Sequence, residues 1–420
     1  MIFMKISKRS WLLWLIATSF FSFQFILRLF PGLIMSDIMT KFKVNAMDFG
    51  ILSAAYYFGY AGMQIPIGIL LDRYSPRNVI SVCALVCSAG IFSFVYSTQW
   101  SLVVFGRFLI GAGSAAGFLG TTKIIRTFFP ESRFTSMVGM SFSLGLLGAL
   151  YGGKPITLLI EQMGWTHVLI LLAWICLIIA VVVYLTFPQF SQAKQDSSSL
   201  QNKPNSAATS VRELFSNHRL IWIALSGAVM VGPLEGFADV WGISYLSTVH
   251  GYTKSHASLI TSSIYCGMLL GGPILSFFAD KYRAFYTIPA LCGLLMALCF
   301  GLLLLASDAL PSEALMVIMS FVGILCCYQV IVIGLASQVV PSHLTGLATS
   351  FANCMNMLAG SFFHLVMGSI MDLKWSGTLV DGIKLYDKQS YISAIMIIPI
   401  MLILGFIGFT LLRTQAGQKS

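Results

Sequence analysis

Five charged residues of this 420-residue chain stand inside long apolar stretches: Arg28, Arg107, Lys154, Glu235 and Asp239. In a lipid bilayer an ionised side chain is costly unless it faces a partner or a water-filled cavity, so each is a functional candidate. Arg28 has the most specific chemistry, because a guanidinium presents paired N–H donors in one plane and binds carboxylate or phosphate through two bonds. We expect Arg28 to bind an anionic group of a ligand; the alternative is an internal ion pair that only holds helices together.

Two carboxylates follow the pair Gly232-Pro233. The four-residue spacing of Glu235 and Asp239 places both on one face of an α-helix. Two like charges this close favour sharing a proton, which suits a proton carrier. The same pair also suits the ammonium group of a ligand, and in a third interpretation Asp239 lies at the outer mouth of the protein and is simply hydrated.

Uncharged polar side chains extend these candidates. Gln24 lies one helical turn before Arg28 and shares its face, while Tyr57 and Tyr60 lie on the next apolar stretch and Asn356 on a later one. We expect these four to contact a ligand. The alternative is that they form interhelical hydrogen bonds, as such residues do equally often in membrane bundles.

The two remaining cations have two interpretations each. Arg107 either pairs with a carboxylate during coupling or braces helix packing. Lys154 points either to a cavity or to the outer lipid headgroups, which its long side chain can reach.

The elements that carry these residues are expected to be membrane-spanning helices. Hydrophobic residues make up 57% of the chain and charged residues 10%, against about 25% charged residues in soluble domains, which excludes a soluble globular protein. Because a span takes about 20 apolar residues and lipid tolerates no unpaired backbone, the charge-free intervals predict an all-α membrane protein. Its twelve expected spans are 11–36, 49–71, 79–98, 101–125, 134–158, 166–187, 219–246, 256–279, 285–306, 314–339, 344–371 and 390–412.

The distribution of basic residues predicts the orientation. With both termini in the cytoplasm, 16 of the 25 Lys and Arg lie on that side, six lie outside and three lie within spans, as the positive-inside rule requires. The net charge of +10 therefore reflects topology, and we expect no nucleic-acid partner. The apolar stretch after the basic N-terminus has no small-residue cleavage site, which predicts a retained first helix. All nine cysteines fall in apolar stretches, which argues against a disulfide framework and a zinc site.

Two internal echoes indicate parallel duplicated halves. Segment 66–74 is echoed by 273–282 at an offset of 208, and segment 129–133 by 340–343 at an offset of 211. Such repeats are typical of one class of secondary transporter. The polar stretch between the sixth and seventh spans predicts a cytoplasmic linker at 188–218 between six-helix domains at 1–187 and 219–420. At an offset of 211, Arg28 and Asp239 occupy matching positions.

Two motifs carry a resemblance to a known family, one in the loop after the second span and one in the fourth span. Their residues are Gly68, Leu70, Asp72, Arg73 and Arg77 in the first and Gly106, Arg107, Gly111 and Gly113 in the second, with departures from the first motif at Ser75 and Asn78. Over its whole length the chain resembles transporters of the major facilitator superfamily. The resemblance implies two pseudo-symmetric six-helix bundles, a coupling role for Arg107, and a conformational latch at the inner face formed by Asp72, Arg73, Arg77 and Asp280.

Within that family the pattern of Arg28, 59–60 and 64–68 is similar to bacterial organic-anion carriers, phagosomal nutrient carriers and the lysosomal dipeptide transporter branch. The resemblance implies a place in the bacterial cytoplasmic membrane, with the first and seventh helices facing each other across the cavity. A cation at Arg28 opposite an anion at Glu235 or Asp239 would complement a zwitterion. We therefore expect a carboxylate-bearing or zwitterionic solute, such as an amino acid or short peptide, moved by alternating access.

The chain has no nucleotide-binding motif, which bears on how transport is driven and on which other classes of protein remain possible. The small-residue stretch 111–117 follows no strand and precedes no Gly-Lys-Ser/Thr, so it predicts close helix packing and not a phosphate loop. We expect proton coupling or facilitated transport by a monomer, without a cofactor. The alternatives are an exporter of a metabolite or siderophore-like compound by antiport, although Ala149 stands where the antiporter signature has Pro, and, from other classes, a non-transporting sensor or a membrane enzyme.

Overall fold

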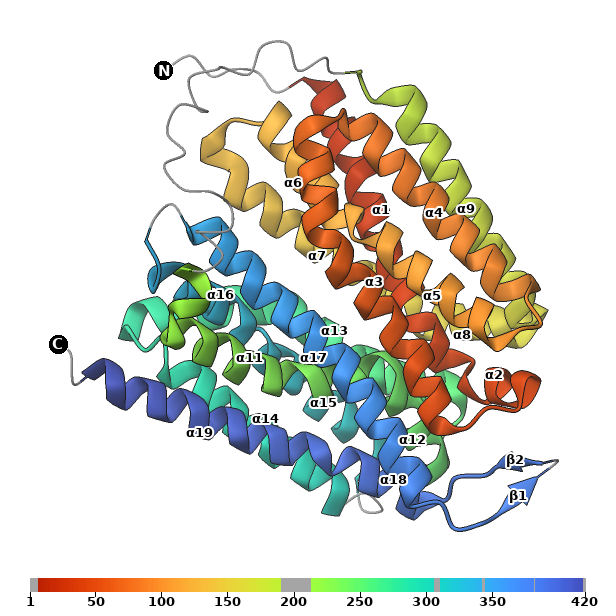
Figure 1. Ribbon diagram of the computed structural model, residues 1–420. Coiled ribbons are helices and arrows are strands. Elements are labelled where there is room, and N and C mark those ends of the chain that lie inside the picture. Colours follow the sequence, from red (N-terminus) through yellow and green to blue (C-terminus); the bar gives the residue numbers. More distant parts are fainter. Residues whose placement is uncertain (1–6, 190–212, 306–309, 342–343, 381, 418–420) are drawn as a thin grey trace. The chain divides into compact units, whose positions relative to one another are not determined.

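The computed structural model describes residues 7–189, 213–305, 310–341, 344–380 and 382–417, so most of the predicted linker lies outside the described part of the chain. The chain forms two compact units. The first comprises Met1–Val44 and Ile51–Ala193, and the second comprises Asn45–Gly50 and Lys194–Ser420. Figure 1 shows that both are built from helices, which confirms the all-α prediction.

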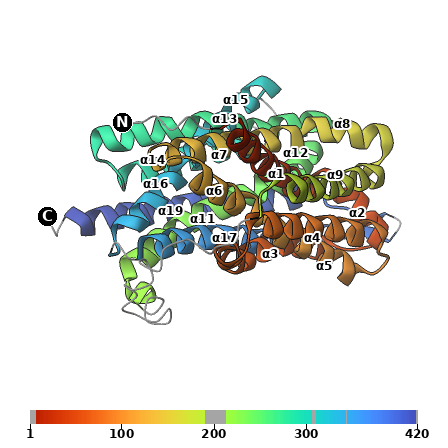
Figure 2. The ribbon, with the colours of Figure 1, turned by 90° about the horizontal axis from the view of Figure 1, so that it is seen from above.

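The first unit is a helical bundle in which α1 packs on α6 and α7, and α4 packs on α5 and α9. Figures 1 and 2 show α4 and α9 side by side. Its elements are α1 (Lys8–Leu33), α2 (Met35–Phe42), α3 (Ala46–Arg73, from residue 51 on), α4 (Pro76–Tyr96), α5 (Trp100–Ser114), α6 (Ala116–Phe128), the 3-10 turn η1 (Glu131–Arg133), α7 (Phe134–Gly152), α8 (Lys154–Met163) and α9 (Trp165–Thr186).

The second unit is also a bundle, in which α11 packs on α17 and α19, α13 on α15, and α14 on α19. Its elements are α11 (His218–Gly236), the π-helix η2 (Phe237–Trp241), α12 (Gly242–His250), α13 (Lys254–Tyr282), α14 (Thr287–Leu305), α15 (Ser312–Cys326), α16 (Tyr328–Gln338), α17 (Thr345–Leu373), strands β1 (Leu379–Val380) and β2 (Ile383–Lys384), α18 (Lys388–Ile395) and α19 (Ile397–Gly417).

The helices agree closely with the predicted spans. Within the described residues, 11 helical stretches are long and apolar enough to cross a membrane, and α3, with 28 residues, is long enough to be the twelfth. Several predicted spans are divided where one helix ends and the next begins, at Ala115, Gly153, Cys327 and Met396, and span 219–246 is divided by the π-helix η2. Helix α2 and the antiparallel hairpin of β1 and β2 lie outside the predicted spans.

Glycines allow backbones to touch in both units, as expected for the small-residue stretch 111–117. A Cβ placed on Gly111 would overlap the carbonyl of Tyr56, and one placed on Gly323 would overlap the carbonyl of Ile264. No side chain fits between α5 and α3 or between α15 and α13 at these points. The prediction of close helix packing there is confirmed.

The first turn of α3 begins with a reciprocal cap. The Oδ1 of Asn45 accepts a hydrogen bond from the backbone N–H of Asp48 at 2.8 Å, and the Oδ2 of Asp48 accepts one from the N–H of Asn45 at 3.3 Å. This is the arrangement of a capping box. It satisfies one of the four N–H groups that a helix start leaves without an internal partner.

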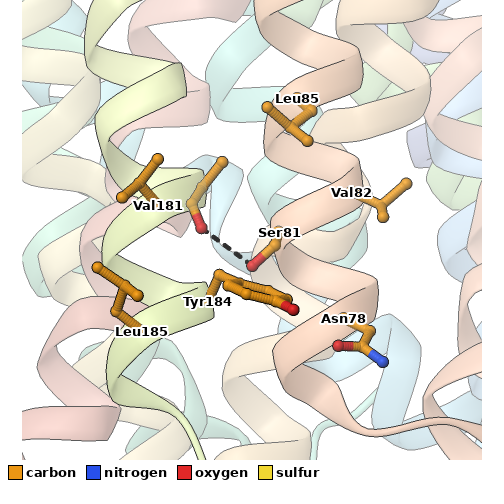
Figure 3. Close-up of a pocket in the computed structure, with 8 residues that line it drawn as sticks. Asn78, Ser81, Val82, Leu85, Val181, Tyr184 and Leu185 are labelled. Atoms are coloured by element: carbon orange, nitrogen blue, oxygen red, sulfur yellow. Dashed lines mark hydrogen bonds between the residues drawn. The ribbon is translucent and has the colours of Figure 1, made fainter.

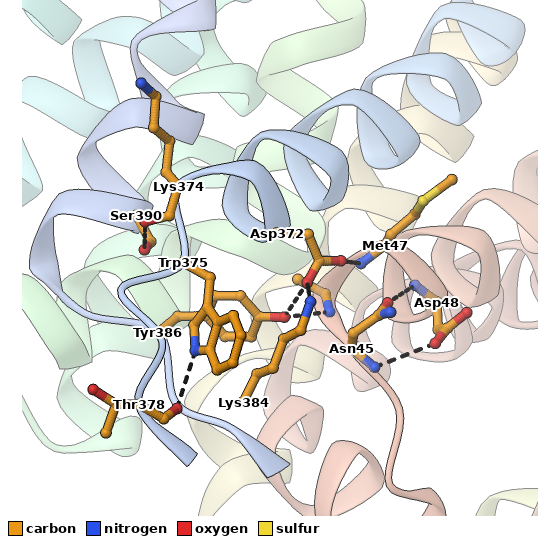
Figure 4. A network of polar contacts seen from close by, with 11 residues as sticks. Asn45, Met47, Asp48, Asp372, Lys374, Trp375, Thr378, Lys384, Tyr386 and Ser390 are labelled. Carbon is orange, nitrogen blue, oxygen red and sulfur yellow. Dashed lines mark hydrogen bonds and ion pairs between the residues drawn. The ribbon is translucent and has the colours of Figure 1, made fainter.

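Two more N–H groups of that turn are satisfied by Asp372, in the last turn of α17, and by Tyr386, between β2 and α18, all within the second unit (Figure 4). The N–H of Ala46 donates to the hydroxyl of Tyr386 at 2.9 Å, and the N–H of Met47 donates to Oδ2 of Asp372 at 2.9 Å. The other carboxylate oxygen, Oδ1 of Asp372, accepts from the Tyr386 hydroxyl at 2.6 Å and from Nζ of Lys384 at 2.8 Å. Burial and the hydrogen bond to Asp372 raise the pKa of Tyr386.

Close backbone packing accompanies this cap. A Cβ on Gly50 would lie 2.5 Å from the carbonyl oxygen of His364, and one on Gly368 would overlap the carbonyl of Ala46. The ring of Phe49 contacts that of Trp241 edge-on, with centroids 6.1 Å apart. Residues 45–50 are therefore docked on α17 by glycine-mediated contact and by the polar cap together.

Candidate functional site

The first unit gathers four of the candidate residues, together with Tyr56, around the middle of α1. We call Gln24, Arg28, Tyr56, Tyr57 and Arg107 the arginine cluster. They come from α1, α3 and α5, and all but Arg28 are at most 3% exposed, while Arg28 is half-buried.

Arg107 binds the backbone of α1. Its Nη1 donates to the carbonyl of Leu27, and its Nη2 donates to the carbonyl of Arg28 at 2.7 Å. In a regular α-helix the carbonyl of Leu27 would accept a hydrogen bond from the N–H of residue 31. That residue is Pro31, which lies inside α1 and has no N–H to donate. Arg107 supplies a donor to this carbonyl, which is the kind of contact that the bracing interpretation predicts, and the coupling role remains a prediction.

Arg28 projects from the helix segment that Arg107 holds. Its guanidinium lies 5.0 Å from the ring centroid of Tyr57 and 6.0 Å from that of Phe25. A guanidinium this close to an aromatic ring is attracted by the electron-rich face of the ring. Arg28 and Tyr57 are thus brought together as a cation and its aromatic support.

Gln24 is tied to Tyr56 and not to a charged group. The hydroxyl of Tyr56 donates to Oε1 of Gln24 at 2.7 Å, and its ring stacks on that of Tyr60, with centroids 6.1 Å apart. The ring of Tyr56 also lies under the guanidinium of Arg107, 4.5 Å from its centroid. Tyr56 was not among the predicted ligand contacts, and no spacing signal separates it from its neighbour Tyr57.

Lys154 does not join the arginine cluster. It is the first residue of α8, directly after the break at Gly153, and its side chain is exposed.

In the second unit the predicted carboxylate pair lies at an irregular turn. Glu235 is 8% exposed and lies near the end of α11, two residues after Pro233, whereas Asp239 is 1% exposed and lies within the π-helix η2. The four-residue spacing had assumed regular α-helix, and that assumption is wrong here, because a π-turn carries an extra residue. Single π-turns of this kind occur often at functional sites.

Asp239 has a specific partner. The hydroxyl of Tyr265, on α13, donates to its Oδ1 at 2.7 Å, and both residues are buried. The interpretation of Asp239 as a merely hydrated group at an outer mouth does not fit a side chain this buried.

Asn356 on α17 lies close to Gln329 on α16, with Nδ2 donating to Oε1 at 3.4 Å, and Asn356 is 2% exposed. The neighbouring Tyr328 donates from its hydroxyl to the carbonyl of Gly227 at 2.7 Å. These contacts are the interhelical hydrogen bonds that were the alternative to ligand contact. We call Glu235, Asp239 and Tyr265 the carboxylate cluster.

The internal repeat relates the two clusters. Arg28 and Asp239 are 211 residues apart, and their aromatic partners Tyr57 and Tyr265 are 208 residues apart. These are the two offsets of the sequence echoes. Each unit therefore holds one charge against one tyrosine at equivalent places, and the offset was the signal that would have identified Tyr265.

The residues of the expected latch lie at or near helix ends. Oδ1 of Asp72 accepts from Nζ of Lys123 at 2.9 Å, with the Asp72 side chain 77% exposed. Arg77 stacks on Tyr184, and Arg73 and Asp280 are exposed. An exposed ion pair contributes about 0 to 1 kcal/mol, so the latch remains a prediction.

Among the described residues no group of three or more His, Cys, Asp or Glu is arranged to hold a metal ion. The arginine cluster offers two guanidinium groups and aromatic faces, and the carboxylate cluster offers two carboxylates and a tyrosine hydroxyl. Groups of these kinds fix the orientation of polar ligands in small-molecule sites in general.

The sequence and the fold were compared with known proteins. The chain is 21% identical over 403 residues to the probable galactarate/D-glucarate transporter GudP of Bacillus subtilis, covering 89% of this chain and 87% of that protein. It is 22% identical over 388 residues to a D-galactonate transporter of Escherichia coli, covering 86% of this chain and 87% of that protein. A bacterial homologue of the human lysosomal transporter Spinster has a similar fold, with a TM-score of 0.74 and 16% identity, covering 96% of this chain and 98% of that one.

These likenesses agree with the helical bundles of the two units. Residues 12–364 match the sequence profile of the Major Facilitator Superfamily, which is most of the chain. The chain is therefore an integral membrane transporter that belongs to the Major Facilitator Superfamily.

Proposed function

We propose that this transporter carries a small organic anion whose carboxylate binds Arg28. The observation that carries the proposal is the geometry of that residue. Its guanidinium is half-buried, stacked on Tyr57, and attached to a helix segment whose backbone is fixed by Arg107. A fixed guanidinium with in-plane donors is preorganised for two parallel bonds to a carboxylate.

The nature of the relatives supports an anion. The two named above are transporters of sugar acids by their names, and sugar acids are carboxylates without an amino group. Of the solutes predicted from the sequence, this favours the carboxylate-bearing class over the amino acid or short peptide.

The carboxylate cluster suits coupling to protons. Asp239 is held by Tyr265, and Glu235 lies one π-distorted turn before it, both in an apolar surrounding where a proton and a carboxylate are best carried as a neutral group. Bringing in an anion together with a proton also compensates its charge. We assign the proton to Glu235 and a positioning role to the Asp239–Tyr265 pair.

Matching positions of Arg28 and Asp239 in the repeat favour one second candidate, a zwitterion with its carboxylate on Arg28 and its amine on a carboxylate. A thermal-shift screen of the purified protein separates the two, because a ligand that binds the folded state raises the melting temperature. We expect D-galactonate and D-glucarate to raise it and amino acids and dipeptides to leave it unchanged. The opposite pattern would establish the zwitterion instead.

The role of Arg28 is tested by graded substitution. Arg28→Lys keeps the charge but loses bidentate geometry, and losing a charge-assisted hydrogen bond costs about 1.5 to 3 kcal/mol, or roughly ten- to hundredfold in affinity. Tyr57→Phe retains the stacking ring and serves as the matched control, with affinity close to wild type, whereas Tyr57→Leu removes the ring and lowers it. If Arg28→Ala binds and transports like wild type, Arg28 has no role in ligand binding.

The role of Glu235 is tested by Glu235→Gln in proteoliposomes. The amide has nearly the same shape but carries no exchangeable charge. If Glu235 carries the proton, exchange of labelled substrate persists because it needs no net proton movement, while uphill accumulation driven by a pH gradient is lost. Loss of both exchange and binding would assign Glu235 to the substrate, and unchanged gradient-driven uptake would exclude both roles.

A further inference from the structure

A groove lies on the first unit between α4, which begins directly after the loop that follows the second span, and α9. It has a volume of about 540 Å³, within the range of about 300 to 1,000 Å³ usual for small-molecule sites. Figure 3 shows α4 and α9 as its two walls. Its lining residues are Asn78, Ser81, Val82, Leu85, Ala180, Val181, Tyr184 and Leu185.

The groove is open to the surroundings of the bundle and apolar along its length. Val82 and Val181 are half exposed, and Leu185 is 73% exposed. The floor is held together by Ser81, whose hydroxyl donates to the carbonyl of Ala180 at 3.0 Å (Figure 3). In a membrane-spanning unit such a surface meets lipid, so an acyl chain is the apolar ligand available to it.

A cation stands at one end of this groove. Arg77 is the second residue of α4, and its guanidinium lies 3.9 Å from the ring centroid of Tyr184. Its Nε is shielded from water and has no hydrogen-bond partner among the described residues, and none of the ion pairs found among them includes it. An arginine held against an aromatic ring at the mouth of a groove is suited to binding a phosphate supplied from outside the chain.

We propose that this groove binds an anionic phospholipid, with an acyl chain between α4 and α9 and the phosphate on Arg77. The charge at the mouth and the apolar walls match the two parts of such a lipid. Basic pockets between transmembrane helices on the cytoplasmic side are known to take anionic headgroups, and the positive-inside distribution predicts that this end of α4 is cytoplasmic. The proposal is independent of the solute carried and goes beyond the proposed function.

The binding test uses the full chain, purified in detergent, stripped of lipid, and titrated with dioleoyl phosphatidylglycerol or dioleoyl phosphatidylcholine under native mass spectrometry. We expect phosphatidylglycerol to bind more tightly than phosphatidylcholine. Arg77→Gln should lower the affinity for phosphatidylglycerol about tenfold, the factor for one charge-assisted hydrogen bond, and leave phosphatidylcholine unchanged. Val82→Trp fills the groove and should weaken both lipids while Arg77 is retained.

The matched control is Arg126→Gln. Arg126 also lies near an aromatic ring, 5.1 Å from the centroid of Phe134, but it is exposed and does not line the groove. Leu185→Trp repeats the groove-filling test at an exposed position should Val82→Trp fail to give a monodisperse protein. Lipid affinities are compared only between variants whose melting temperature matches that of the wild type.

Three results would overturn the proposal. Equal affinity of the wild type for the two lipids would remove the role of the anionic headgroup. An equal loss in Arg126→Gln and Arg77→Gln would show attraction to the basic face as a whole. Displacement of the lipid by glycerol phosphate at the same concentration would show a phosphate site that does not use the groove.

Discussion

Arg107→Met is expected to destabilise the wild-type chain more than it destabilises a chain that already carries Pro31→Ala. In the wild type, Pro31 withholds the N–H that would bond the carbonyl of Leu27, and Arg107 replaces it. Alanine at position 31 restores the backbone donor, so the carbonyl no longer depends on Arg107.

The magnitude follows from the two bonds that Arg107 makes to α1. A buried carbonyl left without a donor costs about 1 to 3 kcal/mol, and hydrogen bonds inside membrane bundles average the lower value of about 0.6 kcal/mol. Only the bond to Leu27 depends on Pro31. We therefore expect a coupling free energy between positions 31 and 107 of about 1 to 2 kcal/mol, well above the scatter of about 0.3 to 0.5 kcal/mol seen for independent sites.

The assay is reversible unfolding of the wild type, the two single variants and the double variant in mixed micelles, followed by tryptophan fluorescence. Pro66→Ala is the matched control, because Pro66 also lies inside a helix, α3, and is exposed, ten residues beyond Tyr56, the residue of that helix that contacts Arg107. Its combination with Arg107→Met should be additive. Additivity at Pro31 as well, or equal coupling at both prolines, would refute the bracing role of Arg107.

Three further outcomes are expected. Tyr265→Phe removes the hydroxyl that holds Asp239, so pH-gradient-driven uptake should fall about tenfold while substrate exchange persists; equal loss of both would place Tyr265 in substrate binding. Gly323→Ala should lower the melting temperature because its Cβ meets backbone, whereas Gly334→Ala, which meets nothing within 4 Å, should raise it slightly, and similar shifts would contradict the packing argument. The pKa of the Tyr386 hydroxyl is raised in the folded state, so the folded state keeps a proton that the unfolded state releases above about pH 10. The free energy of unfolding should therefore fall as the pH rises past that value. Tyr386→Phe should make the melting temperature less dependent on pH in this range.

The spans were predictable because hydrophobicity and the absence of charge report contact with lipid directly. The helix type inside each span was not predictable from the sequence. Backbone groups are hydrogen-bonded in α-, 3-10 and π-turns alike, and side-chain polarity does not distinguish these turns. The breaks at Ala115 and Cys327 and the π-turn around Asp239 belong to this class. Gly153 and Pro233 mark two irregular places in the sequence, but their effect depends on neighbours far along the chain.

The candidate residues were identified because charged groups are rare in apolar stretches. Their partners could be predicted from the sequence only in part. The need for a donor at the carbonyl of Leu27 follows from Pro31 alone, but nothing local identifies Arg107, 80 residues away, as that donor. Tyr265 is different, because the repeat offset applied to Tyr57 points to it. The hairpin of β1 and β2 and the cap formed by Asp372 depend on contacts between turns, which periodicity does not report.

The capped start of α3 provides a built-in reporter. Helix α3 is continuous, yet its residues 45–50 are docked in the second unit while the rest belongs to the first. A rearrangement that separates the two parts must open the cap or bend the helix near Gly50. Opening it leaves the amides of Ala46 and Met47 without their acceptors, Tyr386 and Asp372. The hydrogen–deuterium exchange rates of these two amides would therefore report how often the cap opens, without any label on the transporter.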